Sequence, residues 1–235
     1  LKLKALNDNI NKIRDNIIEC DDISNDIEKN VENINKCQNI DDNLEAGKKE
    51  LAELNSFLMN LLTKFPNLKE SALPKELENI KKRFSVVSKN NDKNKKNLTN
   101  HIDKTIKDKI INYSKLIQQQ NEKVKWCKPD SSSDKYNLEV KLNSLNEIEK
   151  SNSDFNDKIK DIDEFLKIIS KVPKLSSSDL VEMQAQVQKN YEQLVGDCDG
   201  VRKLLENNLS LWSQYDSISE EFLNKLKDVE GKTKS

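Results

Sequence analysis

Two apolar stretches of this chain resemble each other: FLMNLLTKFP at residues 57–66 and FLKIISKVP at residues 165–173, a shift of 107 or 108 residues. Each ends in a proline, which cannot continue a helix because it lacks a backbone N–H and its ring clashes with the preceding turn. We therefore interpret both stretches as the ends of core helices, not as membrane segments or ligand pockets. In the first stretch, the side chains expected to close the core are Phe57, Leu58, Leu61 and Leu62.

The same shift aligns apolar positions and breaks along most of the chain. Cys20 aligns with Cys127, and Pro66 aligns with Pro173. Matched apolar pairs include Ile34 with Leu142, Leu51 with Ile159, Leu54 with Ile162, Ile80 with Val187, and Leu98 with Leu205. Self-similarity at a fixed period is the signature of a repeat architecture, so the sequence predicts a structural repeat of about 107 residues.

The C-terminal part of the chain shows which kind of element builds the repeat. A seven-residue ladder, broken once at Asn208, runs through Leu180, Val187, Leu194, Val201, Tyr215, Phe222 and Val229. A sustained heptad pattern is typical of helical bundles and coiled coils. The chain has only 4 Gly and 4 Pro among 235 residues, so turns are few and the helices are long.

Breakers and capping residues set the expected helix bounds. SSSD occurs at 131–134 and again at 176–179, and such clusters favour helix starts. We expect helices over 1–20, 25–64, 74–107, 108–127, 134–171 and 179–215, with loops near 128–133 and 172–178. No breaker separates the third helix from the fourth, so they form one uninterrupted helix from about Lys75 to Cys127, on the order of 80 Å long at 1.5 Å per residue.

These elements predict an all-α fold of two tandem three-helix-bundle repeats, joined by a continuous helix into an elongated rod. The repeats are residues 1–108 and 109–216, and 217–235 begins the first helix of a further repeat or extends the last helix. We expect a monomer, with a dimeric coiled coil as the structural alternative. No run approaches the roughly 18 apolar residues of a membrane span.

Composition and residue types argue against catalysis. We expect no Ser/His/Asp triad at the single histidine, and no CxxC pair suggests a zinc site. His101, whose repeat partner is Asn208, is expected to be a polar core position that fixes helix register. Gly196 and Gly200 are expected to loosen or kink the last helix. We therefore predict no catalytic, cofactor-binding or metal-binding residue, and four free thiols, with two disulfides as the alternative in an oxidising compartment.

A basic stripe is the strongest candidate binding surface. Residues 81–109 contain ten Lys or Arg and three Asp, whereas 15–32 contain seven acids and one Lys. The candidate partner-binding residues are Lys89, Lys93, Lys95, Lys96, Lys104 and Lys107. Either these charges balance acidic faces of the same bundle, or they bind an acidic partner such as actin, a regulatory domain or a lipid surface. No aromatic residues are interleaved for base stacking, and net charge is −1, so nucleic acid is not expected.

A three-helix repeat of about 107 residues, with its last helix running into the next unit, resembles the spectrin repeat. Trp126 in EKVKWCKP and Trp212 in LSLWSQYDSISEEFLNKL lie where that family places tryptophan, although the other copies have Ile18 and Thr105. The richness in Asn and Lys is similar to the divergent repeats of giant cytoskeletal linkers: nesprin type first, then spectraplakin and dystrophin types.

This resemblance implies a cytoplasmic, non-catalytic rod segment that transmits force between actin and a membrane or the nuclear envelope. It also implies a docked protein partner, for instance an actin regulator such as a formin, and no cofactor. The alternative from another class is a secreted helical receptor-binding domain of a parasite invasion ligand. The Asn and Lys bias favours that alternative, and the repeat argues against it.

Overall fold

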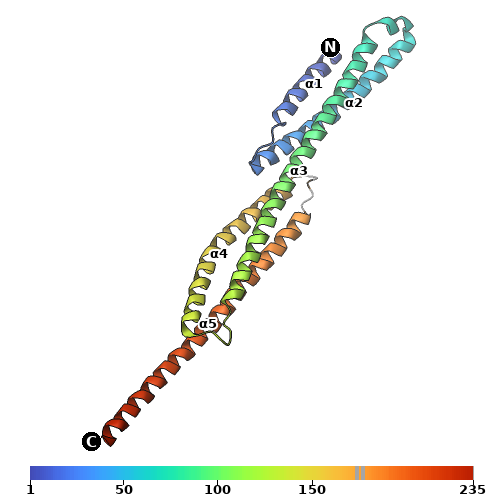
Figure 1. Ribbon diagram of the computed structural model, residues 1–235. Coiled ribbons are helices and arrows are strands. Elements are labelled where there is room, and N and C mark those ends of the chain that lie inside the picture. Colours follow the sequence, from blue (N-terminus) through green and yellow to red (C-terminus); the bar gives the residue numbers. More distant parts are fainter. Residues whose placement is uncertain (173–174, 176–177, 235) are drawn as a thin grey trace. The chain divides into compact units, whose positions relative to one another are not determined.

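The computed structural model describes residues 1–172, 175 and 178–234, and among these it contains helices and no strand (Figure 1). The elements are α1 (Lys2–Glu19), α2 (Ile27–Lys64), the 3₁₀ segment η1 (Pro66–Glu70), α3 (Leu73–Cys127), α4 (Lys135–Ser170) and α5 (Ser178–Thr233). The predicted all-α class is confirmed, and so is the uninterrupted helix to Cys127. The predicted loop near 172–178, with Pro173 and the first two residues of the SSSD cluster, lies largely outside the described residues.

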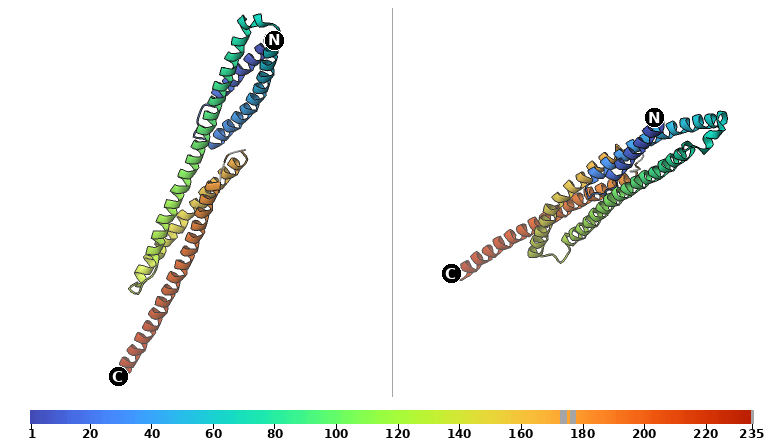
Figure 2. Two further views of the ribbon diagram at one scale, coloured as in Figure 1. Left: turned by 90° about the vertical axis from the view of Figure 1, so that its right-hand side faces the viewer. Right: turned by 90° about the horizontal axis from the view of Figure 1, so that it is seen from above.

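The chain forms two compact units. Unit 1 comprises residues 1–107 with 165–177, and unit 2 comprises 108–164 with 178–235. Within unit 1, α1, α2 and the first part of α3 lie side by side in all views (Figures 1 and 2). Within unit 2, the rest of α3 lies beside α4 and α5. Three long helices in each unit fit a spectrin-like repeat, while the repeat boundaries at 108/109 and 216/217 remain a prediction.

Helix α2 shows how the local sequence sets the bounds. It begins after Asp26, whose carboxylate accepts a hydrogen bond from the Glu28 N–H at 2.9 Å. It ends at Lys64, where the Phe65 N–H donates to the Leu61 carbonyl at 2.7 Å and Pro66 starts η1. The expectation that Pro66 terminates this helix is confirmed.

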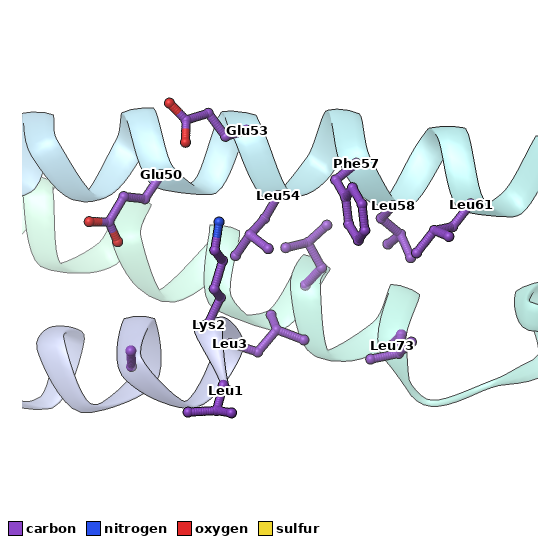
Figure 3. Close-up of a pocket in the computed structure, with 12 residues that line it drawn as sticks. Leu1, Lys2, Leu3, Glu50, Glu53, Leu54, Phe57, Leu58, Leu61 and Leu73 are labelled. Carbon is purple, nitrogen blue, oxygen red and sulfur yellow. The ribbon is translucent and has the colours of Figure 1, made fainter.

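The predicted closure of the core by the end of α2 is wrong in one residue. The Phe57 side chain is 61% exposed, whereas Leu58, Leu61 and Leu62 are half-buried. Phe57 lies with Leu54, Leu58 and Leu61 of α2 along an open groove beside the start of α1 (Figure 3).

Apolar stripes build each core as the periodicity predicts. In unit 1, α1 buries Leu6, Ile10, Ile13 and Ile17 at helical spacing. In α5 the heptad ladder is buried from Leu180 to Val201, but Tyr215, Phe222 and Val229 are exposed. The predicted start of a further unit in this last part of α5 therefore remains a prediction.

Polar side chains also connect the helices of unit 1. The buried amide of Asn91 on α3 donates to the Cys37 carbonyl at 2.8 Å and to the Asp41 carboxylate at 2.7 Å, both on α2. The Asn94 amide donates to the Ile17 carbonyl of α1 at 3.2 Å. We call these contacts the asparagine layer; they tie α3 to both neighbouring helices.

The repeat extends to an interhelical ion pair. Lys95 of α3 pairs with Asp41 of α2, and at the same repeat positions Arg202 of α5 pairs with Glu149 of α4. Hydrogen bonding to Glu149 raises the pKa of the Arg202 guanidinium. Each unit therefore carries a basic-to-acidic contact at this repeat position between its second and third helices.

The two units fill one core position differently. Gly47 of α2 lies against the Phe84 ring of α3, and a Cβ built on Gly47 would lie 2.6 Å from two ring carbons. In unit 2 the repeat shift places Phe155 and Tyr191 at these positions, and the Tyr191 hydroxyl donates to the Asn152 carbonyl at 3.1 Å. Gly47 is thus required by the Phe84 ring, because the backbone and ring approach closely there.

Within the part of the chain that the structure describes, no helix combines the length and apolar character needed to cross a bilayer.

Candidate partner-binding surfaces

The six predicted stripe lysines all lie on α3, but they differ in exposure. Lys89, Lys93, Lys96 and Lys104 are exposed, whereas Lys95 and Lys107 are half-buried. Lys95 contacts Asp41 of α2 and, at 3.2 Å, Asp92 of its own helix. Lys107 pairs with Asp103 one turn earlier at 2.9 Å. Two of the six therefore balance acids of the same unit, as one of the two interpretations expects.

Electrostatics identify Lys95 as part of the bundle. Burial disfavours its charge, but hydrogen bonds to Asp41 and Asp92 outweigh that effect and raise the pKa of the Lys95 ammonium. The Lys95 ammonium group is therefore fixed between α2 and α3. Reversing its charge would disturb the fold as well as any docking surface.

The exposed lysines are spaced more regularly along α3 than the charge count over residues 81–109 indicated. Lys75, Lys82, Lys89 and Lys96 recur every seven residues along α3, and all four are exposed. Successive positions are about 10 Å apart along the axis at 1.5 Å per residue. We call these four the heptad lysine row. Among the described residues, none of the four forms a salt bridge, so the row is a free positive surface.

Sequence reasoning missed Lys75, because charge was counted in a window and not on one helix face. The heptad spacing was the signal that would have found it. The repeat supplies a second observation: the positions equivalent to the row in unit 2 are Glu182, Lys189, Gly196 and Lys203. The fold of the repeat therefore does not require a lysine at these positions.

The second exposed surface is an apolar groove of about 930 Å³ at the end of unit 1 where α1 begins. Leu54, Phe57, Leu58 and Leu61 of α2 line one side, and Leu3 of α1 and Leu73 of α3 line the other (Figure 3). Glu50 and Glu53 lie at its edge on α2.

The repeat explains the residues of this groove. The equivalents of Leu54, Leu58 and Leu61 are Ile162, Leu166 and Ile169, with exposures of 1%, 8% and 0%. The groove residues thus occupy core positions of the repeat, and their chemistry suits packing against a helix. Nothing in the groove is specific for a small polar ligand.

The residues singled out for other roles occupy structural positions. His101 is half-buried on α3, as is its repeat partner Asn208 on α5, and their expected role in fixing helix register stays a prediction. Helix α5 passes through Gly196 and Gly200 without interruption, and both have open space around them. The described residues contain no group of three or more His, Cys, Asp or Glu that could hold a metal ion.

All four cysteines are buried and free. Burial raises the pKa of each thiol, to about 12 for Cys37 and about 11 for Cys198. A raised pKa keeps a thiol protonated and unreactive at neutral pH. None of the four is therefore a nucleophile in the closed bundles.

Comparison with known proteins gives one relevant similarity. No family model matches the chain, and no solved structure matches it. The chain is 33% identical over 235 residues to Muscle-specific protein 300 kDa of Drosophila melanogaster. The match covers 99% of the chain but 2% of that relative, so the chain corresponds to a small part of the length of the curated protein that it resembles.

Proposed function

We propose that this chain is a non-catalytic segment of a giant cytoskeletal scaffold, which bears tension and docks an acidic protein along the heptad lysine row. The helical repeat and the similarity to a muscle protein support the scaffold role. The observation that carries the docking role is the row itself: four exposed lysines in unit 1 without a salt bridge, at positions where unit 2 keeps lysine only twice, as Lys189 and Lys203.

The spacing of the row suits a protein partner with regularly placed carboxylates. A heptad of charges on one helix face is complementary to an acidic helix with the same period, as flanking charges are in coiled coils. Each exposed pair contributes at most about 1 kcal/mol, so four pairs give weak, salt-sensitive binding that adds up over a long scaffold. Lys93 and Lys104 extend the same positive surface.

Helix α3 is the element proposed to carry tension. Its backbone hydrogen bonds continue through residues 107–108, where the two units meet in sequence. Uncoupling the units therefore requires breaking a helix and not bending a loop. We propose that unfolding of the two units is coupled through this helix.

The proposal extends to the class of scaffold, its location in the cell and the type of partner. Nesprin-type linkers are the favoured class, with a cytoplasmic location and attachment to the outer nuclear membrane through other parts of the parent protein. An actin regulator such as a formin is the proposed partner type. The alternative, a secreted receptor-binding domain stabilised by two disulfides, gains no support from four free thiols, and thiol titration of the native protein would test it directly.

Charge reversal tests the docking role. The variant Lys82→Glu, Lys89→Glu, Lys96→Glu is compared with the intact chain in pull-downs from muscle extract and in co-sedimentation with actin filaments at low and physiological salt. Reversal of three exposed, unpaired lysines off the row, Lys49, Lys64 and Lys69, is the matched control. We expect the row variant to lose its partner and the control to keep it. If both variants keep every partner, the docking proposal is wrong.

A further inference from the structure

The end of α1 and the third turn of α2 bring two thiols together inside unit 1. Cys20 is the residue that ends α1, where its N–H donates to the Ile17 carbonyl at 3.1 Å. The chain then reverses into α2, which brings Cys37 to the same level. The two side chains are 1% and 0% exposed, and the Cys37 thiol donates a hydrogen bond to the Cys20 sulfur.

We propose that Cys20 and Cys37 form a reversible thiol–disulfide site that fastens the end of α1 to α2, with a low-molecular-weight disulfide such as glutathione disulfide as the oxidant. The Cys20 thiolate attacks one sulfur of glutathione disulfide, breaks its S–S bond and releases one glutathione thiolate. The Cys37 thiolate then attacks the Cys20 sulfur of the mixed disulfide and releases the second glutathione. The two protons of the protein thiols pass to the two glutathione molecules, so the protein loses two electrons and the glutathione disulfide gains them.

The closed bundle protects this site. Neither sulfur is accessible, and burial raises the pKa of both thiols, that of Cys37 to about 12. Reaction therefore requires the end of α1 to leave the bundle. That end is held by the Asn94 hydrogen bond to the Ile17 carbonyl and by burial of Ile13 and Ile17. Because α1 is the shortest of the long helices, 18 residues, its release is a local opening that precedes global unfolding.

The four cysteines of the chain offer an internal control. The repeat places Leu145 where unit 1 has Cys37, and Cys198 where unit 1 has Asn91. In unit 2, Cys198 accepts a hydrogen bond from the Asn152 amide at 3.8 Å, not from a thiol. The hydrogen-bonded thiol pair is thus particular to unit 1 among the described residues, and the two units are expected to respond differently to the same oxidant.

The experiment uses the whole chain with its four native cysteines. The protein is incubated with glutathione disulfide in a series of urea concentrations below the main unfolding transition, free thiols are alkylated, and peptides are mapped by mass spectrometry. We expect a Cys20–Cys37 peptide pair about 2 Da lighter than the sum of its reduced peptides, because two hydrogens are lost. It should appear at least tenfold faster than a Cys127–Cys198 link and accelerate with urea before global unfolding.

Two variants complete the test. Cys37→Leu installs the residue that unit 2 uses and should give only a glutathione adduct on Cys20. Cys198→Asn installs the unit 1 residue and should leave the Cys20–Cys37 link intact. The oxidised wild-type chain should also unfold at higher urea than the reduced chain, and a thiol reductant should reverse this shift. The proposal is overturned if glutathione adducts accumulate on Cys20 and Cys37 without a link, if the link forms only after global unfolding, or if both units form links at equal rates.

Discussion

Replacing Gly47 with alanine tests the core packing of unit 1. In an exposed helix interior, Gly→Ala stabilises by about 1 kcal/mol because alanine loses less backbone entropy. At Gly47 the new Cβ would lie 2.6 Å from Cε1 and Cζ of Phe84, whose side chain is only 2% exposed. The ring has no solvent to move into, and such overpacking costs roughly 1–3 kcal/mol. The net effect expected for Gly47→Ala is a loss of about 0–2 kcal/mol in the free energy of unfolding.

The same substitution in α5 is the control. A Cβ at Gly196 or Gly200 meets nothing within 4 Å, so each alanine should stabilise the chain by about 1 kcal/mol. Urea unfolding followed by far-UV circular dichroism gives the three free energies on one scale. The double variant Gly47→Ala, Phe84→Leu should show favourable coupling relative to the sum of its single variants, because the smaller side chain removes the clash. Equal stabilisation by Gly47→Ala and Gly196→Ala would refute the close approach of ring and backbone.

Four further substitutions and conditions test other parts of the structure. Arg202→Ala removes the half-buried interhelical ion pair of unit 2 and should lower stability by about 1 kcal/mol in urea titrations, less at high salt; an unchanged midpoint at low salt would contradict this. Ile102→Ala, at a side chain with 0% exposure, should cost about 2–5 kcal/mol, whereas Val86→Ala, 57% exposed, should change little in the same assay. Burial raises the pKa of Cys37 from 9.0 to about 12, so between these pH values the folded chain keeps a proton that the unfolded chain loses. The free energy of unfolding should therefore fall as pH rises from 9 to 12. Cys37→Leu should flatten this decline in the unfolding midpoint. Lys104→Pro breaks α3 and should cost about 3 kcal/mol or more and split calorimetric unfolding into two transitions, whereas Lys104→Ala should keep one.

Much of the fold followed from periodicity and breakers. The absence of Gly and Pro between Pro74 and Pro129 predicted α3 to its last residue, because nothing in that segment can end a helix. The exposure of Phe57 could not be predicted in the same way. Its pattern is that of a core residue, yet its side chain is 61% exposed, and the pattern alone does not show which side chains of another helix face it.

Side-chain contacts between helices could not be predicted from the sequence, for a related reason. The period shows which residues share a face, but not which residue of the next helix stands opposite. Gly47 against Phe84 and Asn91 against Asp41 join positions 37 and 50 residues apart, and only packing brings them together. The heptad lysine row, in contrast, lies on one helix, so the spacing of its four lysines in the sequence already defines its geometry.

The asparagine layer solves an ambiguity that is inherent in a seven-residue pattern. A heptad helix that slides by seven residues along its neighbours presents the same apolar stripe, so apolar burial alone does not distinguish the two alignments. Such a slip in α3 would bring Phe84 or Leu98 to the place of Asn91. The Asp41 carboxylate and the Cys37 carbonyl would then lose the amide that binds them and face a hydrocarbon side chain. The layer therefore contributes little to the strength of helix packing. Its effect is to select one register of α3 relative to the neighbouring helices.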